Sequence, residues 1–247
     1  MKHRANHFNV IIVGGGHAGA EAACAAVKLK QKVALITLDP SSVGRMSCNP
    51  AVGGIAKGQL VREMDVLGAL MPRTTDAAGV QFKLLNLSKG RSVWSPRAQV
   101  DKRLYERCIK KALSGLSGFK ILRGEVINII LNKNKLSGVL FRGGETLFAP
   151  SVVLTCGTFL GGLVHVGEKK TQAGRMGEHQ AVGITEALTS LGLRSGRLKT
   201  GTPPRLDSRT INFNKLEQQY ADEDSYFFSF LTKKNLNKQV SCSMTYT

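Results

Sequence analysis

The amino-acid sequence predicts an α/β protein with a parallel sheet, and three features near its beginning support this fold class. The apolar run 8–13 ends in glycines, as a buried parallel strand does. The alanine-rich stretch 18–30 has the small side chains of a helix that packs closely on a sheet. A second apolar run, 32–38, completes the order strand, turn, helix and strand of a right-handed βαβ unit.

The later part of the chain predicts further elements of the same class. Three short strand-like stretches, separated by Asn-Lys-Asn and Gly-Gly turns, indicate a small antiparallel meander at 126–131, 136–141 and 146–148. A further buried strand is expected at 151–155. Helices are expected at 55–67, 99–113 and 178–191.

The composition changes after residue 200, where we place a domain boundary. Residues 201–247 contain acidic residues, an aromatic cluster and a strand-like end without a closing helix. We therefore assign 1–200 to one domain and 201–247 to the start of an inserted α/β domain that is cut short.

The charge balance indicates a polyanionic partner. The chain has 35 lysines and arginines against 17 acidic residues, which gives a formal net charge of +18. This excess favours nucleic acid over a membrane, because no basic helix with a broad apolar face and no apolar run of membrane-spanning length is evident. A basic surface that serves only solubility is the alternative.

The cysteines indicate reduced thiols rather than a disulfide framework or a zinc site. The five cysteines are widely spaced, and neither a C-x-x-C pair nor a Cys/His cluster at zinc spacing occurs. This usage is typical of a cytoplasmic protein, and we expect no metal site.

The first predicted turn carries a G-x-G-x-x-G pattern between a strand and a helix. It consists of Gly14, Gly15, Gly16, His17, Ala18 and Gly19. In this context the first glycine permits the turn, the second lets the backbone approach a pyrophosphate, and the third lets the helix pack on the strand. The phosphates then lie at the helix N-terminus, where they are favoured by free N–H groups and the helix dipole. A tight turn without a ligand is the alternative.

An acidic residue at the end of the second strand is expected to bind the ribose of such a dinucleotide. Asp39 follows Gly19 at about the usual 20-residue offset. Thr37 lies nearer the end of the strand, so the sequence leaves the ribose-binding residue open.

Cys48 lies in the stretch GRMSCNPAVGGIAKG, residues 44–58. The many glycines and the proline predict a loop that faces a ligand, which is an unusual place for a free cysteine. Arg45, Lys57 and a helix beginning near Ile55 would lower the pKa of the thiol. The alternative is that Cys48 fills a small space beneath a loop that contacts the cofactor.

Several longer stretches resemble the tRNA uridine 5-carboxymethylaminomethyl modification family, also called MnmG or glucose-inhibited division protein A. The matching segments cover nearly the whole chain and include GGGHAGAEAA (14–23), MSCNPAVGGIAKG (46–58), VVLTCGTFLGG (152–162) and GRLKTGTPPRLD (196–207). The resemblance implies a glutathione-reductase-like FAD-binding Rossmann domain with an antiparallel meander. It also implies modification of the wobble uridine, with NADH and methylenetetrahydrofolate as co-substrates. The implied partners are tRNA, a second copy in a homodimer, and an MnmE-type GTPase in a heterotetramer or larger assembly.

The resemblance also implies roles for individual residues. Cys48 matches a catalytic cysteine whose thiolate is proposed to add to uridine C6 or to assist one-carbon transfer. The backbone of Val126 matches an adenine contact, and Gly157 and Thr158 match the second dinucleotide contact. Ala181 falls in the predicted helix 178–191, where many members have a flavin-contacting serine, so only a backbone contact would remain.

Basic residues near the predicted helix 99–113 are candidates for tRNA binding. They are Lys89, Arg91, Arg97, Arg103, Arg107 and Lys110. The last three share one helix face with Lys111, and Trp94 offers a surface on which a base can stack. A solvated helix face is the alternative for each of them.

Three other functions remain open from the sequence. A folate-dependent tRNA uracil methyltransferase flavoprotein shares the glycine pattern and a loop cysteine. A thiol or nicotinamide oxidoreductase normally shows a C-x-x-C motif, which this chain lacks. The third is a truncated, non-catalytic module that binds flavin or tRNA. We expect weak or no activity from 1–247 alone, because the second catalytic cysteine of the family would lie beyond Thr247.

Overall fold

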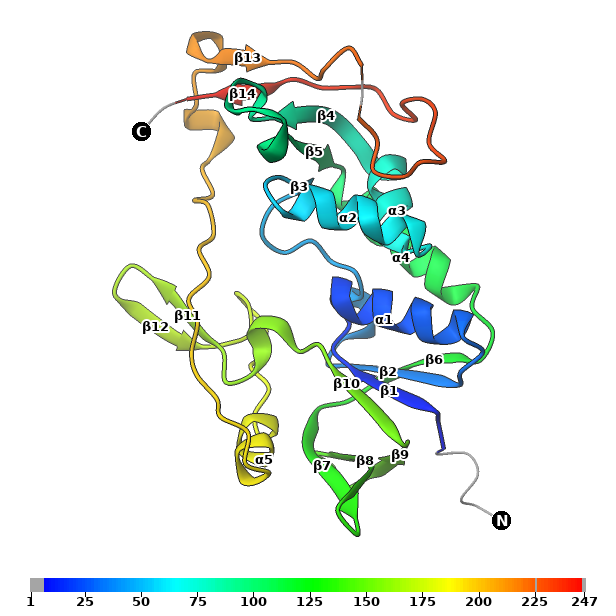
Figure 1. Cartoon of the computed structure of the whole chain (residues 1–247). Coiled ribbons are helices and arrows are strands. Elements are labelled where there is room, and N and C mark those ends of the chain that lie inside the picture. The colour runs from blue at the N-terminus through cyan, green and yellow to red at the C-terminus, as the bar shows by residue number, and fades with distance from the viewer. Residues whose placement is uncertain (1–6, 225, 246–247) are drawn as a thin grey trace. The chain divides into compact units, whose positions relative to one another are not determined.

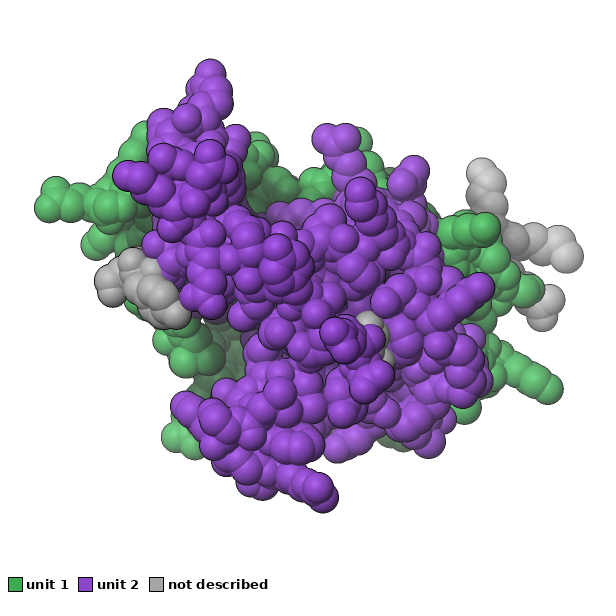
Figure 2. Space-filling model, turned by 90° about the horizontal axis from the view of Figure 1, so that it is seen from above, with its two compact units in different colours: residues 1–45, 110–199 green, residues 46–109, 200–247 purple. Residues whose placement is uncertain are grey.

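The structure is a computed structural model that describes residues 7–224 and 226–245 (Figure 1). The chain forms two compact units, which Figure 2 colours separately. Unit 1 contains Met1–Arg45 and Lys110–Lys199, and unit 2 contains Met46–Ile109 and Thr200–Thr247. Each unit thus combines two separate stretches of chain, whereas the sequence analysis expected one boundary near residue 200. The assignment of 201–247 to an inserted domain stays a prediction.

Unit 1 is built on a four-stranded parallel sheet, which confirms the predicted α/β class. Its strand order is β10-β1-β2-β6, with bounds Ser151–Leu154, Val10–Val13, Val33–Thr37 and Phe119–Arg123. Helix α1, His17–Lys28, links β1 to β2 as predicted. Every residue of β2 is buried, which explains why the sequence shows a continuous apolar run rather than an alternating pattern.

The predicted antiparallel meander is also confirmed. Strands β7 (Val126–Asn132), β8 (Lys135–Phe141) and β9 (Thr146–Phe148) pair in sequence order. Buried meander side chains, among them Val139 and Leu147, share one hydrophobic core with the central strands of the parallel sheet. Figure 1 shows the meander on one side of this sheet and α1 on the other.

In the remainder of unit 1, η2 (Pro40–Ser42) follows β2. The chain after β10 forms η5 (Gly157–Phe159), β11 (Leu163–Val166), β12 (Lys169–Gln172) and α5 (Ile184–Ser190). The helix predicted at 178–191 is wrong in its first part, because α5 begins only at Ile184. Gly183 precedes it with φ = +105°, and the backbone of Ala181 bonds to Phe159 and Gly161 instead of continuing a helix.

Unit 2 has its own three-stranded antiparallel sheet with the order β3-β5-β4. The elements of its first stretch are β3 (Ala51–Gly53), α2 (Lys57–Val66), α3 (Leu70–Ala78), β4 (Gly79–Leu85), η3 (Leu87–Lys89), η4 (Arg91–Val93), β5 (Ser95–Val100) and α4 (Lys102–Ser114). The last helix carries the chain into unit 1. The second stretch adds η6 (Ser208–Thr210), η7 (Phe213–Lys215) and the pair β13 (Glu217–Gln219) and β14 (Cys242–Met244).

Two expected helix starts in unit 2 are wrong by a few residues. The helix predicted at 99–113 begins at Lys102, because Gln99 and Val100 belong to β5 and the carboxylate of Asp101 accepts the first backbone N–H groups of α4. The helix predicted at 55–67 begins at Lys57.

Two aspartates hold the second stretch of unit 2 on its helices. Asp76, only 2% exposed, accepts hydrogen bonds from the backbone N–H groups of Phe228 and Ser229 at 2.9 and 2.8 Å, and from the hydroxyl of Thr232 at 2.8 Å. Asp65 accepts from the backbone of Phe230 at 2.8 Å. Burial raises the pKa of Asp76 above its ordinary value, and the backbone hydrogen bonds oppose that shift.

Candidate functional site

The glycine turn after β1 requires glycine at its first position. Gly14 has φ = +116°, and its N–H donates to the carbonyl of Ile36 at 2.8 Å. A Cβ atom here would lie 2.3 Å from the carbonyl oxygen of Thr155. The turn is thus fixed both by its conformation and by close contact with the chain that leaves β10.

The other two glycines of the pattern have opposite surroundings. At Gly19, inside α1, a Cβ atom would lie 1.9 Å from the carbonyl oxygen of Gly14, so only glycine lets the helix pack this closely on the turn. At Gly16 a Cβ atom would meet nothing within 4 Å, and the residue is exposed. The backbone at Gly16 is therefore the part of the turn that a ligand can approach.

The first turn of α1 supplies the favourable end of a helix dipole beside Gly16. His17 and Ala18 are its first residues, and Ala18 is exposed. Burial, together with the positive charge of Arg175, lowers the pKa of His17, so its imidazole is held neutral. Such a helix end, preceded by an open glycine, suits a phosphate group.

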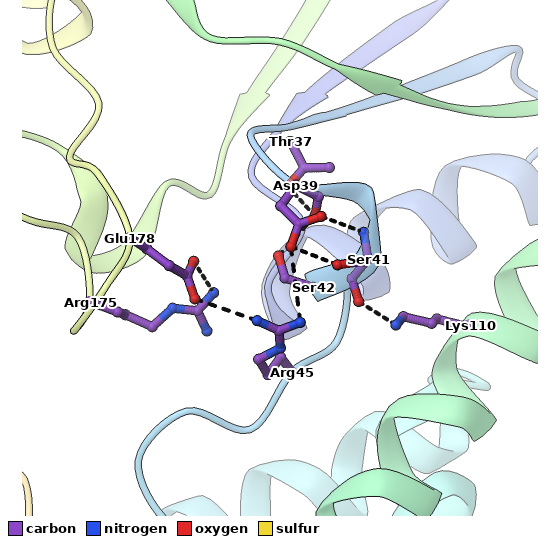
Figure 3. Close-up of polar contacts among 8 residues, drawn as sticks. All are labelled: Thr37, Asp39, Ser41, Ser42, Arg45, Lys110, Arg175 and Glu178. Carbon is purple, nitrogen blue, oxygen red and sulfur yellow. Dashed lines mark hydrogen bonds and ion pairs between the residues drawn. The ribbon is translucent and has the colours of Figure 1, made fainter.

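A polar network surrounds the end of β2, where the sequence left Asp39 and Thr37 as alternatives (Figure 3). The Asp39 carboxylate accepts hydrogen bonds from the N–H and the hydroxyl of Ser41 at 2.8 and 2.7 Å. Both bonds lower the pKa of Asp39, and the bond from the hydroxyl has the larger effect. Thr37 is nearly buried and donates to the Asp39 carbonyl at 3.4 Å. Asp39 remains the more accessible of the two, with 46% of its side chain exposed.

Arg45 joins this network to a distant part of unit 1. In Figure 3 its guanidinium points to both Asp39 and Glu178, at 4.0 and 3.5 Å, and Arg175 pairs with Glu178 at 2.8 Å. The side chain of Lys110 donates to the carbonyl of Ser41. Arg45 is thus engaged by carboxylates of its own unit. Glu178 and Arg175 could not be selected from the sequence, because no local pattern connects them to Arg45, which lies far away in the chain.

The structure places the second group of expected cofactor contacts in unit 1. Val126 is buried at the start of β7, and Gly157 is exposed with φ = +57°. The hydroxyl of Thr158 donates to the carbonyl of Gly174 at 2.9 Å. Ala181 lies outside α5, in the loop before it, so its expected position inside a helix is wrong.

The backbone of Ala181 is part of a hydrogen-bonded bridge. Its N–H donates to the carbonyl of Phe159 at 2.8 Å, and its carbonyl accepts from the N–H of Gly161 at 2.9 Å. The loop that contains Ala181 is therefore fixed directly beside η5, which contains Gly157 and Thr158.

Cys48 lies in unit 2, in the loop before β3, and is exposed. Its carbonyl accepts a hydrogen bond from the guanidinium of Arg205, which lies in the exposed stretch 200–210. Arg205 is not among the site residues expected from the sequence, although it is the last residue of the GTPPR stretch at 201–205.

Cys24, Cys156 and Cys242 have partners or cover that suit packing. Cys24 is buried in α1, and burial raises the pKa of the Cys156 thiol. The thiol of Cys242 contacts the amide oxygen of Gln81 at 3.1 Å.

The six basic residues selected for tRNA binding do not share one environment. Lys89, Arg91, Arg103 and Arg107 are exposed in unit 2. Arg97 is half-buried in β5, and Lys110 belongs to unit 1, where it contacts Ser41.

The ring of Trp94 also has contacts within the protein. The guanidinium of Arg91 lies 5.7 Å from the Trp94 ring centroid, and the indole N–H donates to the carbonyl of Leu87 at 3.2 Å. A base that stacks on this ring would have to displace Arg91 or use the opposite ring face.

Within 7–224 and 226–245, no group of three or more acidic, histidine or cysteine side chains is arranged to hold a metal ion. The helices of the same ranges are too short or too polar to cross a membrane.

Comparison with known proteins identifies the family. The family model described as glucose inhibited division protein A matches residues 9–247. A tRNA uridine 5-carboxymethylaminomethyl modification enzyme MnmG from Thermodesulfovibrio yellowstonii is 47% identical over 240 residues, which are 97% of this chain and 38% of that protein. A protein of the same name from Salinibacter ruber is 47% identical over 244 residues, which are 97% of this chain and 37% of that protein.

A solved structure gives the same result. The crystal structure of Aquifex aeolicus GidA (form II) superposes with a TM-score of 0.92 at 42% identity, over 97% of this chain and 41% of that one. The chain thus spans about two fifths of the length of the relatives that it matches. From its sequence and its structure, the chain belongs to the glucose inhibited division protein A family.

Proposed function

We propose that this chain is the cofactor-binding part of an FAD-dependent enzyme that forms the 5-carboxymethylaminomethyl group on the wobble uridine of tRNA. The observation that carries the proposal is the glycine turn, in which Gly14 and Gly19 are fixed by close contacts while Gly16 stays open at a helix N-terminus. The relatives that cover nearly the whole chain are named as tRNA uridine modification enzymes, and this supports the substrate.

The residues around the turn fit a dinucleotide. The backbone of Gly15, Gly16 and Ala18 would hold the diphosphate, and the end of β2 would hold a ribose through Asp39 or Thr37. Val126, Gly157, Thr158 and Ala181 would line the remaining length of the cofactor. Bound FAD supplies hydride and electron transfer, and the neutral His17 beside the turn adds no charge of its own.

Cys48 is the proposed nucleophile. Its thiolate would form a bond to C6 of uridine, and the C5–C6 electron pair would make C5 nucleophilic toward a one-carbon unit from methylenetetrahydrofolate. Tetrahydrofolate would leave from the transferred carbon as the amino group of glycine bonds to it, which completes the 5-carboxymethylaminomethyl group. Loss of the C5 proton and release of the thiolate would restore the uracil ring. The exposed position of Cys48 supports this role over that of a packing residue.

The remaining parts of the proposal concern partners and compartment. The exposed Lys89, Arg91, Arg103 and Arg107 would contact tRNA phosphates, whereas Arg97 and Lys110 would contribute less. The family resemblance is the basis for NADH as a co-substrate and for an MnmE-type GTPase as a partner. It is also the basis for a homodimer, for a larger assembly with the GTPase and for a cytoplasmic location. We expect 1–247 alone to bind its ligands without completing the reaction.

Titration of the purified chain with FAD tests the proposal most directly. Quenching of flavin fluorescence by the unchanged chain, with binding weakened about tenfold or more in Gly16→Ala, is the expected result. A chain that folds but leaves FAD fluorescence unchanged at all concentrations would refute the proposed cofactor. Nucleoside analysis of tRNA from a deletion strain then separates the reactions: a missing wobble side chain supports the proposal, and missing ribothymidine supports the methyltransferase alternative.

A further inference from the structure

Glu125 lies at the junction of segments that we expect to contact the cofactor. It lies between Gly124, whose N–H donates to the carbonyl of Thr37 at the end of β2, and Val126 at the start of β7. The Gly124–Thr37 bond measures 2.9 Å. The short segment 124–126 therefore connects the predicted ribose end of the site to the predicted adenine contact.

The carboxylate of Glu125 reaches a third segment. Its Oε1 atom accepts a hydrogen bond from the backbone N–H of Val182 at 3.1 Å, next to Ala181. The following residue, Gly183, is packed so closely on β7 that a Cβ atom would lie 2.6 Å from the carbonyl oxygen of Ile127. The loop 181–183 is thus attached to β7 by one charge-assisted hydrogen bond and one close backbone contact.

Arg142 pairs with this carboxylate and favours its ionised form. Its Nε and Nη2 atoms donate to Oε2 and Oε1 of Glu125 at 2.5 and 2.8 Å, in the two-pronged geometry that a guanidinium and a carboxylate favour. The Arg142 hydrogen bonds, followed by the one from Val182, lower the pKa of Glu125, although partial burial opposes the shift. Glu125 is 18% exposed, whereas Arg142 is 54% exposed.

We propose that Glu125 is a positioning residue of the cofactor site, whose carboxylate holds the 181–183 loop so that Val126 and Ala181 keep a fixed separation. This inference rests on the proposed FAD binding. The Ala181 side of the loop is already bridged to Phe159 and Gly161, so Glu125 supplies the attachment on the β7 side. Without that hydrogen bond the Val182 backbone would lose its attachment to the start of β7. Only the bridge to η5 and the packing of Gly183 against Ile127 would then position the loop.

Four variants separate loop attachment from simple ion pairing. Glu125→Ala removes both functions, whereas Glu125→Gln keeps an oxygen that can accept the Val182 N–H but loses the charge. Arg142→Gln breaks the ion pair and leaves the carboxylate available to the loop. Glu145→Gln, an exposed carboxylate of the same meander, is the matched control.

Two measurements on the whole chain test the inference: hydrogen exchange of the Val182 amide without FAD, and the FAD dissociation constant from fluorescence quenching. Glu125→Ala should speed Val182 exchange and weaken FAD binding by about tenfold or more each, since a hydrogen bond to a charged group is lost. Glu125→Gln should give a smaller change of the same kind. Arg142→Gln should stay within about threefold, as expected for a largely exposed partner, and Glu145→Gln should match the unchanged chain.

The outcomes distinguish this inference from the proposed function. If the unchanged chain takes up no FAD, the proposed function is refuted and the inference falls with it. If the unchanged chain and Glu125→Ala bind FAD equally well, the inference alone is overturned. It is also overturned if Arg142→Gln is as harmful as Glu125→Ala, or if exchange rises throughout unit 1, because Glu125 would then only stabilise the fold.

Discussion

Replacing Gly19 by alanine should destabilise the protein, although glycine to alanine inside a helix usually stabilises it. The usual gain is about 1 kcal/mol. At Gly19, however, the added Cβ would lie 1.9 Å from the Gly14 carbonyl oxygen and 2.9 Å from Oγ1 of Thr155. The Gly14 carbonyl cannot move freely, because it accepts the Thr155 hydroxyl at 3.0 Å.

The magnitude follows from this geometry. Separating the Cβ from the carbonyl oxygen requires a shift of more than 1 Å, and overpacking of this kind costs about 1–3 kcal/mol. Weakening the hydrogen bond from Thr155 adds about 1 kcal/mol. After the helix gain is subtracted, we expect Gly19→Ala to lower the free energy of unfolding by about 2 kcal/mol.

Urea denaturation measures this loss, with Gly16→Ala as the matched control in the same turn. Gly16 has φ = −74°, and its added Cβ would meet nothing within 4 Å, so its unfolding free energy should stay within about 0.5 kcal/mol of the unchanged chain. With a slope of about 2 kcal/mol per molar urea, the Gly19→Ala midpoint should fall by about 1 M. A Gly19→Ala chain as stable as the unchanged one would refute the close contact between α1 and the turn.

Three further results are expected. In a full-length family member that contains this chain, Cys48→Ser should keep bound flavin and lose uridine modification. Unchanged modification activity would exclude a catalytic thiol. Asp76→Ala should lower the free energy of unfolding by about 3 kcal/mol, because three hydrogen-bond donors lose a buried acceptor. Urea denaturation measures this loss, and a value below about 1 kcal/mol would contradict the role of Asp76. The depressed pKa of Glu125 means that its ion pair stabilises the fold above the ordinary glutamate value of 4.5 and that this stability is lost as the pH falls through the folded pKa. The stability difference between the unchanged chain and Arg142→Gln should therefore shrink on acidification, and a difference that stays constant with pH would contradict the pairing.

The sheet and the meander could be predicted because their signals are local. Fully buried strands such as β2 appear as apolar runs, and glycines mark where the turns must be. Strand β6 was missed, since it lies at a sheet edge with most of its side chains exposed and shows no apolar run. Helix α3 was missed as well, because Pro72 and two threonines lower its helix propensity.

The candidate site was predictable only where its residues are neighbours in the chain. The glycine turn follows from one short pattern, and its geometry distinguishes the open Gly16 from the crowded Gly14 and Gly19. The contacts of Glu178 with Arg45 and of Glu125 with Val182 join distant segments, and they depend on backbone positions that no pattern encodes.

The place of β1 in its sheet has a consequence for folding during synthesis. β1 lies between β2, which follows it closely, and β10, which is translated only after β2, all of 46–109 and the meander. Until Ser151–Leu154 leave the ribosome, one side of an almost entirely apolar strand has no hydrogen-bonding neighbour, and such open edges promote aggregation. Nascent chains that stall before this point should need a chaperone, and shortened versions of the gene that end before Ser151 should give insoluble protein.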